Sequence, residues 1–133
     1  MPEWGVIPSI RVRGMAEALT FYVQTLEFSL TSGGEEATNS ALDRGDAHVM
    51  IETAADHYGA EYNAAIKERL GTPSPIALYI EAEDLAPFYS RLEASGVARI
   101  IDPLAERVWG QDEFTVEDLD GNWLTFWKKT GGA

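Results

Sequence analysis

The sequence Trp109-Gly-Gln-Asp-Glu-Phe-Thr-Val-Glu-Asp-Leu-Asp-Gly-Asn-Trp-Leu-Thr-Phe-Trp127 decides the fold of this chain. Two of its segments, residues 113–117 and 123–128, are rich in aromatic and β-branched residues, which favours strands. The Asp-Leu-Asp-Gly-Asn between them offers Gly and Asn for a positive φ angle, so the pattern predicts a tight hairpin. Three of the four tryptophans lie in this stretch. We therefore expect the hairpin to form the inner wall of a pocket.

The rest of the chain predicts the same order of elements twice. Each half, about 70 residues long, reads as a strand, a helix and three further strands. The expected elements before the hairpin are strand 6–12, helix 15–26, strands 28–31, 37–42 and 47–53, helix 61–70, strand 76–82, helix 85–95 and strand 98–102. Pro103 is expected to begin a loop that reaches Trp109.

Two such halves, each burying its helices on one face of a sheet, would leave the other face free. We therefore predict an α+β fold in which two βαβββ modules, at about residues 5–53 and 76–128, form curved mixed sheets around a central cleft. The helices would lie on the outer faces. Residues 54–75 would form a partly helical connector, and residues 1–133 a single domain.

The composition narrows the possible partners. The 133 residues are 45% hydrophobic and carry a formal net charge of −12, from 22 acidic and 10 basic residues. An acidic chain repels nucleic acid and attracts cationic ligands, although an acidic surface also serves solubility alone. The chain has no cysteine, no apolar run of membrane-spanning length and no signal peptide. A cytoplasmic protein without a nucleic-acid or membrane partner is therefore expected.

Three stretches together carry a family resemblance. They follow one another in a specific order. The first is residues 12–22, which end in a Phe-Tyr pair, the second is residues 80–96, and the third is the hairpin with residues 109–114 and 118–122. In this respect the chain resembles the vicinal oxygen chelate superfamily, which includes glyoxalase I, extradiol dioxygenases, fosfomycin-resistance enzymes and bleomycin-resistance proteins. The resemblance covers nearly the whole chain. It departs at Gly14, Glu27 and Leu119, where the family usually has Asp, Gly and Pro.

The resemblance also implies where a metal would bind. In metal-dependent members of the superfamily, the ligands come from the inner face of four strands. The corresponding positions here are Ile7, Glu52 (or its same-face neighbour Met50), Ala77 and Thr125. A divalent ion needs three or four ligands, and one carboxylate among these residues is too few. We therefore expect no metal and no cofactor.

The two histidines do not complete such a site. His48 is four positions from Glu52 on one strand, which is about 13 Å in an extended chain. His57 lies in the expected connector. An exposed or hydrogen-bonded role for His48 is the alternative to ligand binding.

Strand alternation predicts which side chains line the cleft. The candidate ligand-binding residues are Arg11, His48, Met50, Glu52, Tyr79, Trp109, Trp123, Thr125 and Trp127. Aromatic rings with a few carboxylates suit a planar or cationic organic ligand, through stacking and cation–π attraction. Other roles remain open. Arg11 is equally a counter-ion for Glu52 or Glu81, and Glu52 is alternatively a solvated strand-end carboxylate. Trp109 and Trp127 are alternatively packed core or a dimer contact. Tyr58 and Tyr62 either pack on a helix face or close over the cleft.

Three functions are compatible with these patterns. The first is a metal-free protein, similar to the bleomycin-resistance branch, that sequesters an antibiotic or another small ligand, cations included, and does no chemistry. The resemblance implies a homodimer for that branch. The second is a lyase or isomerase with Glu52 as general base, or a dioxygenase-like enzyme with a displaced metal site. The third is a structural or regulatory protein with a vestigial cleft.

Overall fold

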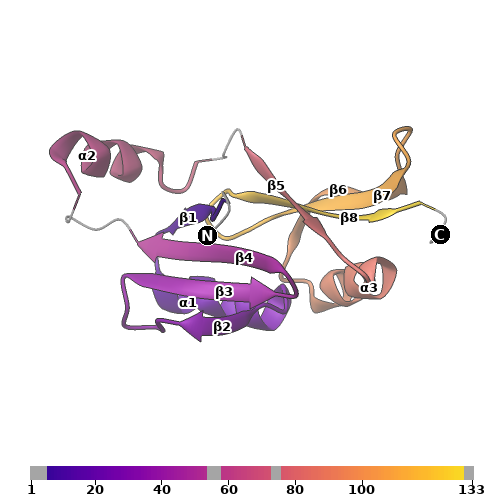
Figure 1. Ribbon diagram of the computed structural model, residues 1–133, viewed down its shortest axis with the longest axis horizontal. Coiled ribbons are helices and arrows are strands. Elements are labelled where there is room, and N and C mark those ends of the chain that lie inside the picture. The colour runs from indigo at the N-terminus through magenta and orange to yellow at the C-terminus, as the bar shows by residue number, and fades with distance from the viewer. Residues whose placement is uncertain (1–5, 54–57, 73–75, 131–133) are drawn as a thin grey trace, which may run out of the picture. The chain divides into compact units, whose positions relative to one another are not determined.

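The computed structural model describes residues 6–53, 58–72 and 76–130 (Figure 1). The chain divides into two compact units, Met1–Gly71 and Thr72–Ala133. Each unit contains a four-stranded mixed sheet with helices. The predicted α+β class with two βαβββ modules is therefore confirmed. The expectation of a single domain around a shared cleft depends on how the two units are placed relative to each other, and it stays a prediction.

The first unit follows the predicted order of elements. Its elements are β1 (Ser9–Val12), α1 (Met15–Thr20), the π-helical segment η1 (Phe21–Thr25), β2 (Ser29–Ser32), β3 (Asn39–Arg44), β4 (Ala47–Thr53) and α2 (Ala60–Arg69). The strands form a sheet in the order β1-β4-β3-β2. β1 runs parallel to β4, and the other two pairs are antiparallel.

The core of the first unit forms between this sheet and α1. Ile10, Val12, Val49 and Ile51 point to one face of the sheet and are buried, as the alternation of apolar residues predicts. The helix buries the apolar side that its three- and four-residue spacing predicts. The buried residues of α1, η1 and the position after them are Met15, Ala18, Leu19, Phe21, Tyr22 and Leu26.

The predicted helix 15–26 is not α-helical throughout. From Phe21 to Thr25 it is a π-helix, in which the amide of Leu26 donates to the carbonyl oxygen of Phe21 at 3.0 Å. The wider turn buries two consecutive aromatic residues, Phe21 and Tyr22, whose rings pack edge-on with centroids 5.8 Å apart. A regular α-helix turns about 100° between neighbours, which makes burying both more difficult.

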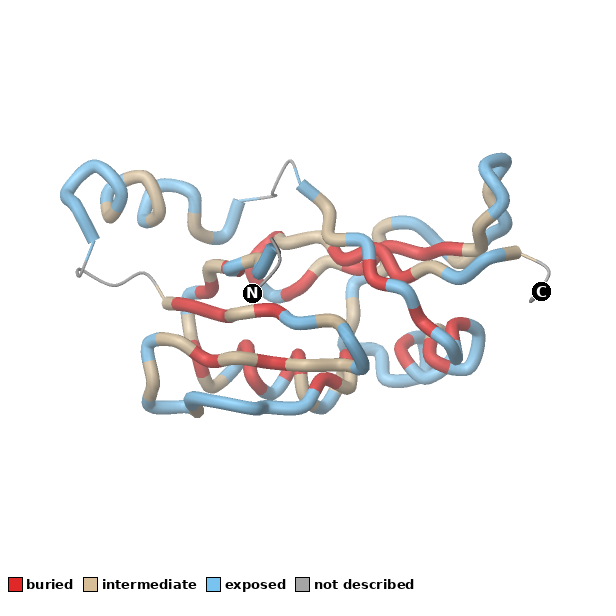
Figure 2. The backbone as a smooth tube through the Cα atoms, viewed as in Figure 1, coloured by how far each residue is buried: buried red, intermediate tan, exposed pale blue. Residues whose placement is uncertain are grey.

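The second unit repeats the pattern. Its elements are β5 (Ala77–Glu81), α3 (Leu85–Ser95), β6 (Arg99–Glu106), β7 (Gln111–Glu117) and β8 (Trp123–Lys129). The sheet order is β5-β8-β7-β6, with β5 parallel to β8. Phe88 of α3 packs against Phe114 and Phe126, with ring centroids 5.9 and 5.0 Å away. Figure 2 marks buried stretches in red along α3 and the central strands β7 and β8.

The hairpin turn between β7 and β8 is held by the carboxylate of Asp118. Its Oδ1 accepts hydrogen bonds from the amides of Asp120 and Asn122, each at 2.8 Å. Its Oδ2 accepts from Asn122 Nδ2 at 2.9 Å. Gly121 has a φ of 87°, the left-handed conformation that glycine adopts without a steric penalty. The predicted tight hairpin with a positive φ angle is confirmed.

Two expectations for the second unit were wrong. Pro103 does not begin a loop, because β6 continues through it to Glu106. β6 is an edge strand with register shifts on both sides of Asp102, and irregular edge strands are where a sheet accommodates proline. The strand expected at 76–82 begins one residue later, so Ile76 precedes β5 and is exposed.

The helix α2 differs from its prediction in its packing. In the helix expected at 61–70, the residue spacing makes Tyr62, Ile66 and Leu70 the apolar edge. No residue of α2 is buried, and Tyr62 is exposed. No helix among the described residues is long and apolar enough to cross a membrane.

Candidate functional site

The face of the first sheet away from α1 carries the polar residues of β1 and β4. Arg11 lies beside Glu52, and Ser9 beside Met50, across the parallel pair. Two positions before Met50, His48 lies on the same face. The structure thus gathers the four candidates from this unit on one face, as alternation predicts. Their role in binding stays a prediction.

Glu52 is a buried carboxylate surrounded by donors. The residue is only 3% exposed, so the alternative of a solvated strand-end carboxylate was wrong. Arg11 Nη1 lies 2.6 Å from its Oε1, and the Ser9 hydroxyl donates to the same oxygen at 3.3 Å. The Tyr58 hydroxyl donates to Oε2. These partners supply the opposite charge and the hydrogen bonds that a buried carboxylate needs.

Two tyrosines cover Arg11. Its guanidinium carbon lies 5.6 Å from the ring centroid of Tyr58 and 5.4 Å from that of Tyr62, within cation–π range. Arg11 also donates through Nη2 to the Tyr62 hydroxyl. The hydrogen bond to Glu52 is the largest of the effects that raise the pKa of Tyr58 above its ordinary value of 10.0. Arg11 is therefore the counter-ion of Glu52.

This arrangement limits what Glu52 can do chemically. A general base needs a carboxylate whose lone pairs reach the substrate and whose charge is not neutralised. Both oxygens of Glu52 already accept hydrogen bonds, and a guanidinium compensates its charge. The site is built to hold Glu52 in place rather than to let it take up a proton.

His48 lies on the same face but is exposed. Its Nδ1 is 2.6 Å from Asp43 Oδ1. This hydrogen bond, and then the Asp43 charge, raise the pKa of His48 from 6.5. The hydrogen-bonded alternative to a ligand role describes this geometry. His57 lies outside the described residues.

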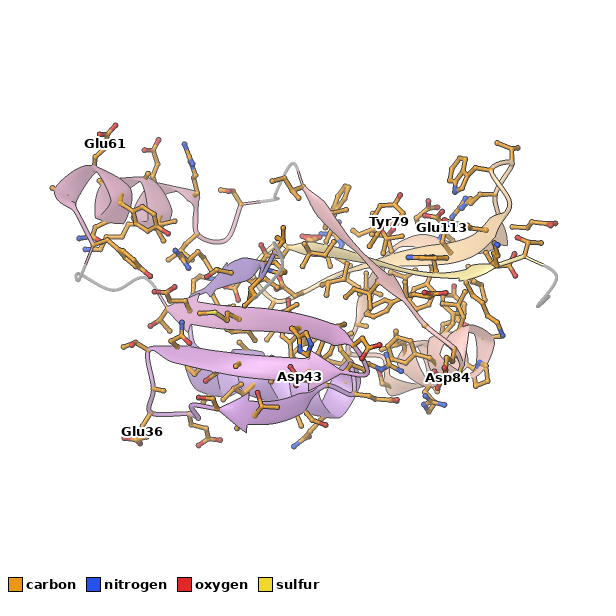
Figure 3. All side chains as sticks on the ribbon, viewed as in Figure 1. Glu36, Asp43, Glu61, Tyr79, Asp84 and Glu113 are labelled. Carbon is orange, nitrogen blue, oxygen red and sulfur yellow. The ribbon has the colours of Figure 1, made fainter. Side chains whose placement is uncertain are left out.

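The helix-free face of the second sheet is aromatic. Tyr79 on β5 lies beside Thr125 on β8, and the hairpin register places Trp127 opposite Glu113. Figure 3 shows Tyr79 and Glu113 on the side of the sheet away from α3. Trp123 shares this face by alternation, and both tryptophans are partly exposed. The candidates from β5 and β8 are thus gathered on one surface.

Glu113 is the acidic centre of this surface. The residue is 5% exposed, and Trp109 Nε1 donates to its Oε1 at 2.6 Å. The Tyr79 hydroxyl also hydrogen-bonds to its carboxylate. Desolvation, followed by the charge and the hydrogen bond of Glu113, raises the pKa of Tyr79 above 10.0. The phenol therefore stays a donor at neutral pH.

Glu113 has no cationic partner among the described residues. The neighbouring guanidinium of Arg107 pairs with Asp102 Oδ2 at 3.0 Å. It reaches only main-chain oxygens near Glu113, the carbonyls of Pro103 at 3.1 Å and of Glu113 itself at 3.5 Å. The carboxylate of Glu113 thus receives two neutral donors, in contrast to Glu52.

The sequence did not single out Glu113 as a site residue. It was assigned only to a strand, although its position opposite Trp127 in the hairpin was available as a signal. Its hydrogen bond to Trp109, by contrast, depends on how the β6–β7 turn folds back, with Gly110 at a φ of 88°. No residue pattern specifies that direction.

Two further polar groups lie on the same sheet face. The hydroxyls of Thr115 and Thr125 are 2.7 Å apart and buried, so each is the partner of the other. The indole nitrogen of Trp123 is buried and has no hydrogen-bond partner within residues 6–53, 58–72 and 76–130. A buried N–H of this kind is a donor available to a ligand or to water.

The family's metal positions do not fit a divalent ion. In the first unit they hold the exposed Ile7 and the fully partnered Glu52. In the second they hold Ala77 and Thr125, whose hydroxyl is bonded to Thr115. Over residues 6–53, 58–72 and 76–130, no group of three or more His, Asp and Glu side chains could hold a metal ion.

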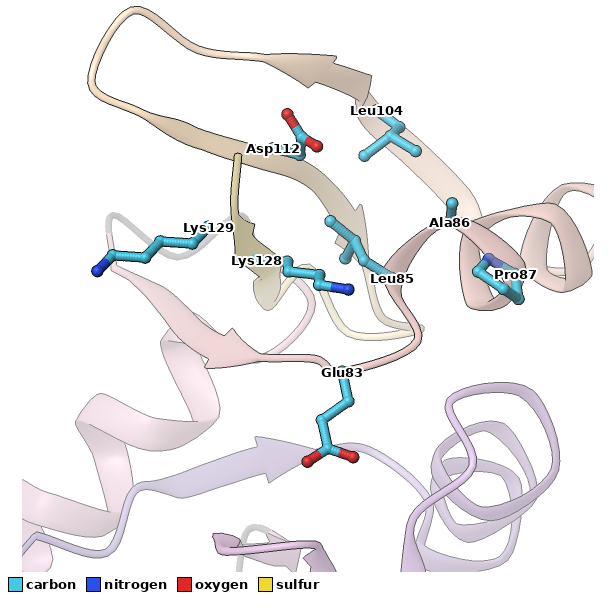
Figure 4. A pocket seen from close by; sticks show the side chains of 8 residues that line it. All are labelled: Glu83, Leu85, Ala86, Pro87, Leu104, Asp112, Lys128 and Lys129. Atoms are coloured by element: carbon cyan, nitrogen blue, oxygen red, sulfur yellow. The ribbon is translucent and has the colours of Figure 1, made fainter. Parts of the chain in front are cut away.

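A pocket lies elsewhere in the second unit (Figure 4). It measures about 200 Å³ and is near the start of α3. Its lining residues are Glu83, Leu85, Ala86, Pro87, Leu104, Asp112, Lys128 and Lys129. None of the predicted site residues lines it. Its small volume and mixed charges do not suit an aromatic ligand.

Solved structures support the fold. UcmS2 aligns with a TM-score of 0.73 at 18% identity, covering 96% of this chain and 98% of that one. TioX from Micromonospora sp. ML1 gives 0.72 at 21%, with 93% and 94% covered. The bleomycin-binding protein from Streptomyces verticillus, crystallised with copper(II)-bleomycin, gives 0.64 at 21%, with 95% and 96% covered.

Sequence comparison identifies the family. No curated protein matches the chain. However, the sequence model described as Glyoxalase/Bleomycin resistance protein/Dioxygenase superfamily matches residues 6–126. This match includes both four-stranded sheets and agrees with the resemblance in the hairpin and the two strand-to-helix passages. The chain therefore belongs to the glyoxalase/bleomycin resistance protein/dioxygenase superfamily.

Proposed function

We propose that this protein binds a small aromatic or cationic organic molecule stoichiometrically and without a metal. The observation that carries the proposal is the helix-free face of the second sheet. It combines the rings of Tyr79, Trp123 and Trp127 with the carboxylate of Glu113. Aromatic faces attract planar rings and cations, and a buried carboxylate is stabilised by a positive charge.

Two further observations support this proposal. The bleomycin-binding protein from Streptomyces verticillus was crystallised with a metal complex of bleomycin, and a large cationic drug of that kind is one candidate ligand class here. The net charge of −12 favours the approach of a cation. Sequestration of an antibiotic in the cytoplasm by a homodimer is the biological form of the proposal.

A titration tests the proposal. Purified protein is titrated with a panel of aromatic cations, including metal-free bleomycin, while tryptophan fluorescence and heat of binding are recorded. We expect saturable binding of at least one compound at one ligand per chain. We also expect the protein as purified to contain less than about a tenth of an equivalent of any transition metal, a level that contamination accounts for. Failure of every compound to bind, or a full equivalent of metal, would overturn the proposal.

An enzymatic role for Glu52 is the alternative. Its pairing with Arg11 and its bond to Tyr58 disfavour proton abstraction. An assay of glyoxalase turnover with methylglyoxal and glutathione addresses it directly. Turnover that is lost in Glu52→Gln would replace the sequestration proposal with a lyase or isomerase.

The proposed homodimer is tested separately. Sedimentation velocity at micromolar protein should give about twice the chain mass of 14.6 kDa. A single monomeric species would contradict the dimer and leave ligand binding to be judged by the titration.

A further inference from the structure

Glu113 differs from the other buried carboxylate in what neutralises it. Its two partners, the indole N–H of Trp109 and the hydroxyl of Tyr79, carry no charge. A carboxylate offers about four lone-pair positions, so two neutral donors leave part of this capacity unused. Charge-assisted hydrogen bonds to a cationic N–H are about twice as strong as those from neutral donors. The carboxylate can therefore accept a cation that the described residues of this unit do not supply.

The two donors also frame the approach to the carboxylate. Tyr79 and Trp109 are 60% and 62% exposed, whereas Glu113 is 5% exposed. Their rings thus face solvent while their polar ends touch the acid. A ligand that reaches the carboxylate meets aromatic surface first, and a cation gains from those rings as well.

The Trp109 donor lies on an exposed turn. The next residue towards the N-terminus, Val108, is fully exposed, and the turn itself is closed by main-chain bonds between Arg107 and residues 110 and 111. The indole can therefore rotate away about its side-chain torsions without the turn opening. Its N–H donates a hydrogen bond to the Glu113 carboxylate until a stronger donor replaces it.

We propose that Glu113 is the subsite for an organic cation that carries N–H groups, a protonated amine or an amidinium, and that Trp109 is a displaceable donor. The cation's N–H would bond to the Glu113 carboxylate. The freed indole ring would cover the cation's hydrocarbon part. The inference rests on the proposed function, because it specifies the chemical group by which the ligand of that face is recognised.

Benzamidine is the probe for the test. It is compared by calorimetry with benzamide, a neutral molecule of the same shape, and with phenyltrimethylammonium, a cation without N–H. We expect benzamidine to bind about tenfold or more tightly than either, since a hydrogen bond between charged groups has that effect. Equal affinity for phenyltrimethylammonium or benzamide would overturn the subsite.

Three variants locate the effect. Glu113→Gln keeps an oxygen acceptor for both donors and should lose the preference for benzamidine over benzamide. Glu117→Gln is the matched control, because Glu117 lies on the same strand face and already pairs with Arg99 at 2.8 Å; it should keep the preference. Trp109→Phe retains a ring and removes the competing N–H, so benzamidine should bind as tightly or more tightly. Unfolding midpoints near the parent's establish that each variant is folded.

The outcomes separate the inference from the function beneath it. If another aromatic cation binds but benzamidine does not, or if Glu113→Gln binds benzamidine like the parent, the subsite is wrong and the proposed function stands. If no member of the panel binds, both are wrong. Weaker binding in Trp109→Phe would contradict displacement of the indole.

Discussion

Two buried glutamates show at the scale of single residues how neighbours decide a role. Glu52 is neutralised by Arg11 at 2.6 Å, whereas the donors to Glu113 in the described part of the chain are all neutral. Removing one member of a buried ion pair leaves the other charge without compensation. Replacing an acid that has neutral partners with its amide keeps most of its hydrogen bonds. Glu52 therefore contributes more to stability than Glu113 does, whereas the Glu113 carboxylate is the better placed of the two to bind a ligand.

Glu52→Gln should therefore destabilise the protein by about 2 kcal/mol, because Arg11 loses its compensating charge. Glu113→Gln should cost less than about 1 kcal/mol, since the amide oxygen still accepts from Trp109. Urea unfolding of both variants measures the difference. A larger loss for Glu113→Gln would contradict the contrast between the two sites.

Glu27 has a φ of 66°, where the resembling proteins usually have glycine. A side chain in this region strains the backbone, so Glu27→Gly should stabilise the protein by about 0.5–1 kcal/mol. The lost ion pair with Arg44, at 3.6 Å, is long and partly exposed, so it contributes little to stability. Glu27→Ala removes the same pair and keeps the strain, so it should be less stable than Glu27→Gly. Equal denaturant midpoints for the two variants would refute the strain.

At the scale of elements, the β7–β8 hairpin carries a cross-strand pair that can be tested as a unit. Thr125→Val leaves the buried Thr115 hydroxyl without its partner and should cost about 1–2 kcal/mol. The double variant Thr115→Val/Thr125→Val should recover part of this loss. A double-mutant cycle should give a coupling of about 1 kcal/mol, and strictly additive losses would show that the hydroxyls do not interact.

The helix α2 has no buried residue and is connected to the first sheet through Tyr58 and Tyr62. Tyr62→Leu removes the contact with Arg11, so the amides of α2 should exchange faster with deuterium. Amides of β4 should exchange as in the parent. Unchanged exchange in α2 would mean that other contacts hold it.

How much the sequence could predict differs between elements. α3 and β4 have the predicted bounds, and the alternation along β1 and β4 gives the buried faces, because burial on one face imposes a two-residue period. The loop predicted from Pro103 was wrong because an irregular edge strand tolerates proline. The Glu113 centre was missed because the hydrogen bond from Trp109 depends on the direction in which the exposed β6–β7 turn folds back. Alternation gives the face of a residue but not its hydrogen-bond partners.

For the whole molecule, the net charge of −12 should make cation binding depend on salt. Screening at high ionic strength weakens the attraction between a negative protein and a positive ligand. The affinity for benzamidine should fall at least about threefold between about 20 and about 500 mM sodium chloride. The Debye length at these two concentrations is about 20 Å and about 4 Å. Benzamide should bind independently of salt in the same calorimetric titrations. Salt-independent binding of benzamidine would show that the protein's charge plays no part.

The turn held by Asp118 has a consequence for chemistry several residues away. Side chains alternate between the two faces of a strand, so a shift of one residue in the hairpin would exchange the faces of β7. Phe114 would then stand opposite Trp127, and the Glu113 carboxylate would point into the core beneath α3. By fixing the alignment of the two strands through three hydrogen bonds, one aspartate determines whether the aromatic surface contains an acid at all.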